Sequence, residues 1–461
     1  MNMQKRFFGK WKAPTLLFVL VLCMLFAASC KDAQNLTPEV LPTEDMATPP
    51  PTEEAAPPEA EVAEEVAAVD VTAPRPAWDT DARMLDTVFI EVENPNQWGD
   101  KTDERIAKLT YEGEGQRFTC WIKIKPQGTS SLIYPKKNFT INMYADAECT
   151  QKLPMAMREH WGEQSKYCLK ADWIDPTHAT NVVAASLAAQ MQAKYDLFSD
   201  APNRGLIDGF PVVLRMNGEF YGIYNFNIPK DLWQFGMDKD NPDHIIMCLE
   251  GQDGSCLFTE PVVQSEWTIE GGPETDETWA KLDRVADFIR TADDETFRAS
   301  AHEYLDIDAC LNYYLFALYA TGFDNTAKNM LLATYDGLVW SPSLYDLDSL
   351  WGVAWNGAYT IPNDLPIFGP ESFRNSLLWE KLERVFHTEL QERFSELQED
   401  ILNPPHIIRM HERYIMSIDR HWYDMQAERW TYEEEMVDRM AQLTGNIYAR
   451  DAYVREWLGL Q

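Results

Sequence analysis

The sequence predicts an α+β fold, with a strand-rich N-terminal part and a helical C-terminal part. Three observations support this class. Apolar and polar residues alternate along several stretches between residues 86 and 146, which is typical of strands. Beyond about residue 275 the apolar residues recur with helical spacing. Of the 461 residues, 45% are apolar, which is enough for the core of one large domain or two ordinary ones.

Residues 1–30 have the features of a bacterial lipoprotein signal peptide. Basic residues precede an apolar run from Thr15 to Phe26, and small residues then lead directly to Cys30. A Cys in this place resembles a lipobox, so we predict lipidation of Cys30. The alternatives are an ordinary cleaved signal or an uncleaved anchor. In each case we expect the body of the protein outside the cytoplasm, and lipidation would anchor it to a bacterial membrane, at the cell surface or in the periplasm.

Residues 31–78 are predicted to form an acidic tether. No Lys or Arg occurs from Asp32 to Pro74, where Glu, Pro and Ala dominate. Such a composition buries too little apolar surface to offset the entropy lost on ordering, so the segment is expected to stay extended and solvated. The folded domain is therefore predicted to span residues 79–461.

Charge and cysteine content exclude some classes of function. The formal net charge of −34 makes binding to nucleic acid phosphates improbable, so no nucleic acid partner is expected. The six cysteines beyond Cys30 permit disulfides in an oxidising compartment, and Cys248 and Cys256 are the closest pair in sequence. Zinc is disfavoured because no Cys-x-x-Cys or His-Glu-x-x-His spacing occurs.

The strands between residues 86 and 146 predict an antiparallel sheet with one buried face. In the last of them, Lys137 shares the alternation of the apolar Phe139 and Ile141, whereas Lys136 falls on the other face. Lys137 is thus predicted to point inward, where an unpaired ammonium is costly. Its partner would be a structural carboxylate or a bound phosphate.

Further elements follow in order along the chain. The stretch 167–175 predicts a strand that carries Lys170, and a helix is predicted to follow it. A hairpin is then expected around Asn217-Gly218. Helices are predicted over 278–292 and 307–321, and again from 375 to 459 with a break at Pro404-Pro405.

A hairpin is also predicted inside the helical part, within residues 321–352. Asp324 opens the loop after the buried helix, and Asn329 follows five residues later. Two strands joined at Asp336-Gly337 come next. The returning strand is followed directly by a Tyr-Asp-Leu-Asp sequence, so the hairpin is expected to bring acidic residues back to its starting edge.

The residues brought together there would be Asp324, Asn329, Asp346 and Asp348. Taken singly, each acid is explained by a turn or a cap. Together the carboxylates would repel each other unless a cation lay between them, and oxygen ligands select hard ions such as Mg²⁺, Mn²⁺ or Ca²⁺. The order Asp, Asn, hairpin, metal-holding Asp is also that of protein kinases. The pattern is therefore suited to holding a metal nucleotide against a hydroxyl.

Four stretches resemble the CotH kinase family, an atypical branch of the protein-kinase-like fold. They are GTSSLIYPKKNFTINMY, YCLKADWIDPTHATNVVAASL, VVLRMNGEFYGIYNFNIPKD and DNTAKNMLLATYDGLVWSPSLYDLDSLWG. A closing helix, IYARDAYVREWL, also fits, so the resemblance covers roughly residues 84 to 460. It implies an atypical protein-kinase-like fold, with a strand-rich N-terminal lobe and a helical C-terminal lobe.

The resemblance also implies an activity and its metal side. Asp324 would be the catalytic Asp, Asn329 a metal ligand, and Asp346 or Asp348 the metal-holding Asp. The implied cofactor is ATP with Mg²⁺ or Mn²⁺, and Ca²⁺ is a further option. The implied reaction transfers phosphate to Ser or Thr hydroxyls of an exported protein.

On the nucleotide side, the resemblance places the Gly128 loop with Ser130, together with Lys137, over the phosphates. Lys170 is the second candidate for the nucleotide lysine. A Gly turn followed by hydroxyls offers backbone N–H groups to an anion, although it is also an ordinary hairpin loop.

The chain departs from the family pattern at three places. Thr180-Asn181 replaces the common Arg-Asn, Tyr345 replaces a Trp, and Ile228 replaces a frequent Glu. The loss of that Glu weakens the case for ordinary ATP use, whereas the metal-side motif is intact.

Two other classes of function compete with the kinase interpretation. The first is a catalytically inactive binding or structural lipoprotein on a kinase-like scaffold, because a fold does not determine function. The second is a glycosidase that pairs Asp324 with Asp346, which leaves Asn329 and an inward Lys137 without a role.

Overall fold

The structure is a computed structural model that describes residues 75–79, 85–113, 115–358, 360–369, 371–372, 375–431 and 438–460. All of these belong to one compact unit, Ala68–Gln461. The predicted signal peptide, its lipidation site Cys30 and nearly all of the predicted tether lie outside the described residues.

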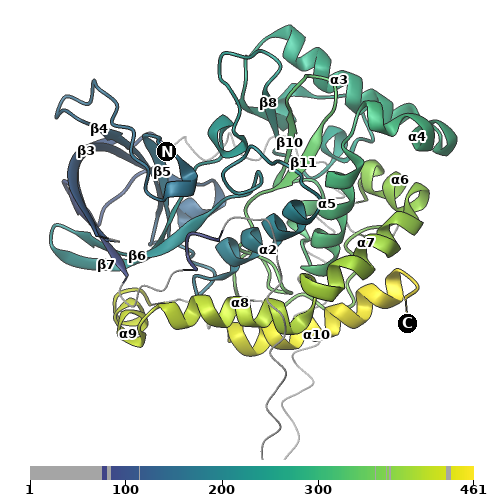
Figure 1. Cartoon of the computed structure of the whole chain (residues 1–461). Coiled ribbons are helices and arrows are strands. Elements are labelled where there is room, and N and C mark those ends of the chain that lie inside the picture. The colour runs from purple at the N-terminus through teal and green to yellow at the C-terminus, as the bar shows by residue number, and fades with distance from the viewer. Residues whose placement is uncertain are drawn as a thin grey trace, which may run out of the picture. The chain divides into compact units, whose positions relative to one another are not determined.

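The first part of the described chain is a closed β-barrel with strand order β1-β2-β3-β4-β5-β7-β6 (Figure 1). Neighbouring strands are antiparallel except β1 and β6, whose parallel pairing closes the barrel with Val88 opposite Leu214. Along β3, every second residue from Cys120 to Pro126 is fully buried, so the apolar face points into the barrel. The strands are β1 (Asp86–Glu91), β2 (Arg105–Gly113), β3 (Gln116–Gln127), β4 (Asn138–Tyr144), β5 (Lys166–Lys170), β6 (Gly209–Met216) and β7 (Glu219–Asn227).

The predicted strands and the predicted hairpin of this part are confirmed. Asn217 and Gly218 join β6 to β7 with φ values of 50° and 86°, which the tight hairpin turn requires. The sheet is not open, however. Pairing of β1 with β6 removes the free edges that an open sheet would expose.

A second sheet with strand order β11-β10-β8-β9 lies in the other part of the chain. The predicted hairpin is its β10–β11 pair, in which Met330 is opposite Leu344. The strands β8 and β9 were not predicted, because all five residues of β8 are buried and show no alternation. The strands are β8 (Ile245–Leu249), β9 (Trp267–Gly271), β10 (Met330–Thr334) and β11 (Ser341–Leu344).

Helices supply most of the remaining structure. The predicted helices are observed, and the predicted break at Pro404-Pro405 is the start of α8, where Pro is tolerated because the first helical N–H groups have no partner in the helix. The helices are α2 (Thr180–Lys194), α3 (Asp276–Thr291), α4 (Asp294–Ser300), α5 (Ile307–Tyr319), α6 (Leu377–Val385), α7 (His387–Asp400), α8 (Pro404–Ser417), α9 (Arg420–Arg429) and α10 (Arg439–Trp457).

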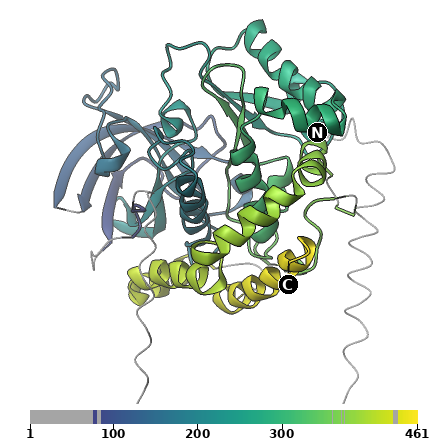
Figure 2. The ribbon, with the colours of Figure 1, turned by 45° about the vertical axis from the view of Figure 1, so that its right-hand side comes forward.

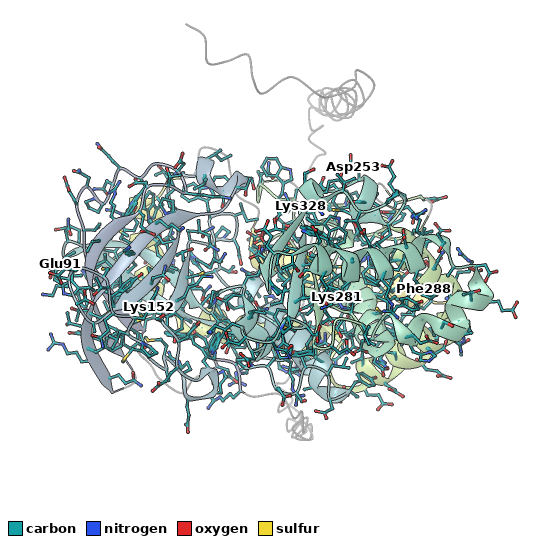
Figure 3. The ribbon with its side chains drawn as sticks, turned by 90° about the horizontal axis from the view of Figure 1, so that it is seen from above. Glu91, Lys152, Asp253, Lys281, Phe288 and Lys328 are labelled. Carbon is teal, nitrogen blue, oxygen red and sulfur yellow. The ribbon has the colours of Figure 1, made fainter. Side chains whose placement is uncertain are left out.

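The barrel and the helical part lie side by side, as Figures 1 and 2 both show. Seen from above in Figure 3, Glu91 and Lys152 lie on the barrel side, and Phe288 lies toward the opposite side. The helix α9 lies against β7 of the barrel, where Trp422 stacks on Phe220. The helices from α8 onward therefore connect the two parts.

The folded body begins before the predicted start at residue 79. Ala77 and Trp78 are 5% and 3% exposed, and the indole Nε1 of Trp78 donates to Ser186 Oγ over 2.8 Å. The ring also packs edge-on against Tyr414. The predicted tether boundary at residue 78 is thus too late.

The described residues show whether the folded domain contains disulfides or a helix that could span a membrane. The six cysteines from Cys120 onward are buried free thiols, so Cys248 and Cys256 form no disulfide here. No helix within the described ranges has both the length and the apolar character needed to cross a membrane.

We expect Trp78→Ala to lower the free energy of unfolding by about 3–5 kcal/mol, because it leaves a cavity and removes the hydrogen bond from the indole to Ser186. The measurement is urea denaturation of the full chain. Trp355→Ala is the matched control, since Trp355 is 59% exposed, and it should change stability by less than about 0.5 kcal/mol. Equal midpoints for the two variants would show that the segment before residue 79 is not part of the fold.

Candidate functional site

Two lysines and three aspartates line one small cavity, which we call the lysine–aspartate pocket. Its free volume is about 30 Å³. The charged residues are Lys136, Lys170, Asp172, Asp346 and Asp348. The lysines and Asp172 come from the barrel and the segment after β5, and the other aspartates follow β11, so the pocket forms only when both parts of the chain are folded.

Lys136 is the most buried charged group of the pocket, with 1% of its surface exposed. Its Nζ donates to the carbonyl oxygens of Ala171 (2.8 Å) and Ile223 (2.5 Å) and lies 4.6 Å from the ring centre of Tyr224. Burial lowers the pKa of Lys136 to about 7, and the nearby Asp172 carboxylate offsets part of that effect. Burial therefore weakens the preference of this amine for its charged form.

The prediction that Lys137 points inward is wrong, and Lys136 takes that place. Lys137 is half-buried, does not line the pocket, and donates to the carbonyl oxygens of Leu132 and Tyr134 over 2.6 Å each. The prediction assumed that the strand with its alternating faces already includes both lysines. Because β4 begins only at Asn138, neither lysine lies on the pleated strand.

The pKa of Asp348 reflects the presence of several acidic side chains in one pocket. Although part of its surface is exposed, dense protein around the carboxyl raises its pKa well above the usual range, and the charges of Asp346 and Asp172 add to the rise. Lys170 opposes it. A divalent cation would relieve this repulsion, so the donor set fits a hard metal ion.

Buried amides hold the aspartate-bearing segments in place. Asn181 Oδ1, at the start of α2, accepts from the backbone N–H of Leu347 over 3.1 Å, between the two aspartates. Asn225 Nδ2 donates to Asp172 Oδ2 over 2.9 Å, and the hydroxyl of Tyr414 donates to Asn225 Oδ1 over 2.7 Å. Asn225 and Tyr414 were missed in the sequence, where they look like ordinary strand and helix residues.

A buried ion pair lies behind the pocket. Arg439 Nε at the start of α10 is 3.7 Å from Asp175 Oδ1, and both side chains are at most 2% exposed. Arg439 Nη2 also donates to the carbonyl of Leu350 (3.1 Å) and to Thr180 Oγ1 (3.0 Å). Arg439 therefore ties α10 to the start of α2 and to the segment that carries Asp348, which sequence inspection did not suggest.

The loop that contains Asp324 and Asn329 lies beside the end of β11. Asn325 Nδ2 donates to the carbonyl oxygens of Asn329 (3.2 Å) and Tyr345 (3.0 Å). The hairpin thus returns to its starting edge as expected. Asn329 is buried and Asp324 is half-buried in a short 3₁₀ turn, but neither lines the lysine–aspartate pocket. Their predicted catalytic and metal roles stay predictions.

The Gly128 loop borders the pocket through other residues than those predicted. Ser131 and Tyr134 line it, whereas Gly128 does not and Ser130 is exposed. Gly128 has φ 115°, and a Cβ there would lie 1.9 Å from Ser131 Oγ, so only glycine fits. These positions do not show whether the loop binds phosphate, so that role stays a prediction.

Several residues in and near this site have left-handed backbone. Asp172, His178, Asn329 and Asp346 have φ values of 45°, 60°, 61° and 58° without being glycine. Such conformations cost about 1–3 kcal/mol each and persist only where surrounding contacts impose them. The imidazole of His178 is buried with its Nδ1 3.6 Å from Asp172 Oδ2, so it packs against the same carboxylate.

A second polar cluster lies beside the pocket and is already neutralised. Cys248, Glu250 and Glu270 place potential ligand atoms within 4.8 Å of one another. Lys230 Nζ lies 2.6 Å from Glu270 Oε1 and 3.4 Å from Cys248 Sγ, so an ammonium occupies the position that a metal would need. The cluster is better explained as a partly exposed ion pair than as a metal centre.

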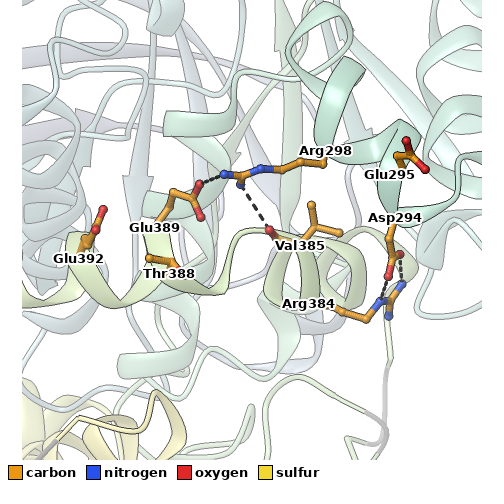
Figure 4. Close-up of a pocket in the computed structure, with 8 residues that line it drawn as sticks. All are labelled: Asp294, Glu295, Arg298, Arg384, Val385, Thr388, Glu389 and Glu392. Atoms are coloured by element: carbon orange, nitrogen blue, oxygen red, sulfur yellow. Dashed lines mark hydrogen bonds and ion pairs between the residues drawn. The ribbon is translucent and has the colours of Figure 1, made fainter.

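A much larger cavity, about 650 Å³, lies away from the pocket between α4 and the α6–α7 region (Figure 4). Arg384 pairs with Asp294 over 2.7 Å, and Arg298 pairs with Glu389. Both arginines of this cavity are satisfied by exposed ion pairs, so the cavity offers no unpaired cation to a ligand.

Fold and site together define an α+β protein with a barrel, a helical part and a cation-competent pocket between them. The sequence pattern of the family described as CotH kinase protein matches residues 124–457. The chain therefore belongs to the CotH kinase family. No match was found among curated proteins.

We expect Asp348→Asn to stabilise the metal-free protein near neutral pH, by about 2–4 °C in Tm, because it removes a carboxyl whose folded-state pKa is raised. A raised folded-state pKa means that stability is lost as pH rises above the ordinary Asp range. The advantage of the variant should therefore disappear as pH falls toward about 4.

Thermal unfolding in EDTA and in Mg²⁺ or Mn²⁺ tests this expectation. The metal should raise the Tm of the wild type but not that of Asp348→Asn. Asp240→Asn is the control, because the Asp240 side chain is 77% exposed and should respond to neither condition. If the Tm of Asp348→Asn in EDTA were below that of the wild type, burial and the neighbouring carboxylates would not be destabilising the charged form of Asp348.

Proposed function

We propose that this protein is a metal-dependent phosphotransferase with a kinase-like fold, which transfers phosphate from ATP to Ser or Thr hydroxyls of an exported protein. The observation that carries the proposal is the lysine–aspartate pocket, where Lys136 and Lys170 share one cavity with Asp346 and Asp348. Membership of the CotH kinase family supports the same class of reaction.

The chemistry divides between the two kinds of side chain. Asp346 and Asp348 would hold Mg²⁺ or Mn²⁺, with Asn329 as a further ligand, and the metal would neutralise phosphate charge. Lys136 and Lys170 would attract the phosphate oxygens from the barrel side. Asp324 would accept the proton of the substrate hydroxyl. The roles of Lys137, Gly128 and Ser130 pass to Lys136 and Ser131 in this proposal.

The size of the pocket limits how the nucleotide would bind. A free volume of about 30 Å³ holds a cation or a water molecule but no nucleotide. Tyr134 and Trp173, which stack with ring centres 5.8 Å apart, both line the pocket. Binding of ATP would require these rings to separate, which is a movement of the barrel loops relative to the aspartates.

The same observation favours a second candidate, a catalytically inactive binding lipoprotein on this scaffold. A closed pocket and Ile228 in place of the frequent Glu both suit a protein that no longer binds ATP. Nucleotide binding separates the two candidates.

We expect the full chain to incorporate labelled phosphate from ATP into a generic protein acceptor with Mg²⁺ or Mn²⁺. Asp346→Asn, Asp324→Asn and Lys136→Met should each reduce the rate by about 100-fold or more, since each removes a charge needed at the transition state. Asp240→Asn should retain full activity.

The contrary result is no incorporation by the wild type together with no metal-dependent nucleotide binding by calorimetry. That pair of results would eliminate the kinase proposal and leave the binding lipoprotein. Activity that survives Asp324→Asn but not Asp346→Asn would keep the kinase and remove the predicted base.

We also propose that the protein is exported and attached to a bacterial membrane by lipid on Cys30. The sequence before Cys30 supports this placement. Growth with labelled fatty acid should label the wild type and Cys23→Ser but not Cys30→Ser, which should be released from the membrane fraction. Equal labelling of both variants would contradict the anchor.

A further inference from the structure

A groove separate from the lysine–aspartate pocket lies between the barrel and α9. We call it the tryptophan–cation groove and define it by Asn96, Trp98, Pro135, Lys137, Arg429 and Trp430. Its volume is about 480 Å³, much larger than that of the pocket. The indoles of Trp98 and Trp430 are half-buried, so each leaves part of an apolar surface to a ligand.

The two cations of this groove have no carboxylate partner among the described residues. Lys137 Nζ donates only to backbone carbonyls, and Arg429 Nη2 donates to the amide oxygen of Asn96 over 2.7 Å. Arg429 Nε is buried and has no hydrogen-bond acceptor within the described chain. In a protein with 74 acidic and 40 basic residues, two neighbouring cations without an acid are unusual. An anionic ligand would complement both cations.

One short segment forms the wall between the groove and the pocket. Along residues 134–138, Tyr134, Lys136 and Asn138 line the lysine–aspartate pocket, whereas Pro135 and Lys137 line the groove. A ligand seated in the groove would therefore touch the same segment whose alternate side chains form the candidate active site.

A second connection runs through α9 and β7. Gly222 has φ 154°, and a Cβ there would lie 2.8 Å from Gln426 Oε1 and 3.0 Å from Lys136 Cε, so the missing side chain lets α9 approach the buried lysine. Trp430 packs edge-on against Trp173, which lines the pocket. The groove and the pocket are thus direct neighbours.

We propose that the tryptophan–cation groove docks an acidic, carboxylate-rich segment of the acceptor protein and thereby selects acidic substrates for the adjacent pocket. This proposal rests on the proposed phosphotransferase function. Lys137 and Arg429 bind carboxylates of the segment, and Trp98 and Trp430 pack against its apolar atoms. Charge complementarity identifies this occupant, because a neutral segment would bring no carboxylate to either cation.

The test is fluorescence anisotropy of the full chain in detergent, without nucleotide. The probes are a short fluorescein-labelled peptide with Ser between Glu residues and the same peptide with Gln in place of Glu. The Glu peptide should bind more tightly than the Gln peptide, and Arg429→Gln should weaken only the Glu peptide, by about tenfold in Kd. Arg420→Gln on the same helix is the matched control, since the Arg420 side chain is 91% exposed and should leave Kd unchanged.

Equal affinity for the two peptides, or no effect of Arg429→Gln, would overturn the docking proposal. The sequence Glu433-Glu434-Glu435 follows Trp430 closely. If the Glu peptide binds only after these three are changed to Gln, the occupant is the chain itself and the partner proposal fails. Peptide binding by a protein that neither incorporates phosphate nor binds nucleotide with metal would retain the groove and reject the phosphotransferase instead, so the two failures are distinguishable.

Discussion

Repulsion among Asp172, Asp346 and Asp348 is the constraint around which the described structure is arranged. Little water reaches their pocket, so the charges are poorly screened and must be balanced by protein groups. Lys136 and Lys170 bring positive charge from the barrel side. Asp172 comes from the barrel side with the lysines, whereas Asp346 and Asp348 follow β11, so the site brings together charges from both parts of the chain.

The supporting shell is built from buried polar contacts rather than from apolar packing alone. Arg439 anchors α10 to the segment that carries Asp348, and Asn181 anchors that segment to α2. Asp172 and Asp346 in the same region have left-handed backbone, a cost that only a rigid surrounding structure sustains. Replacing such a buried partner by an apolar residue would leave a charge or an amide unpaired. A buried polar group without a partner lowers the stability of the fold.

Gly222 on β7 lies next to residues of both the lysine–aspartate pocket and the tryptophan–cation groove. Because that residue has no side chain, Lys136 and Gln426 of α9 can both approach β7 at this position. The pocket contains three aspartates together with two lysines, and the groove contains two cations without a carboxylate partner among the described residues, although only the segment 134–138 separates them. In a strongly acidic protein, this local separation of charge is what gives each surface a distinct class of ligand.

Local periodicity and turn chemistry were enough to predict the α+β class, most of the barrel strands, the β10–β11 hairpin and the main helices. They also indicated which acids gather after β11. Packing between distant segments was needed to show that Lys136 and not Lys137 is buried, that the sheet closes, that β8 and β9 exist, and that Trp78 belongs to the body. Arg439 and Asn225 entered the site for the same reason. Their roles depend on contacts between segments distant in sequence, which alternation and spacing along one segment do not encode.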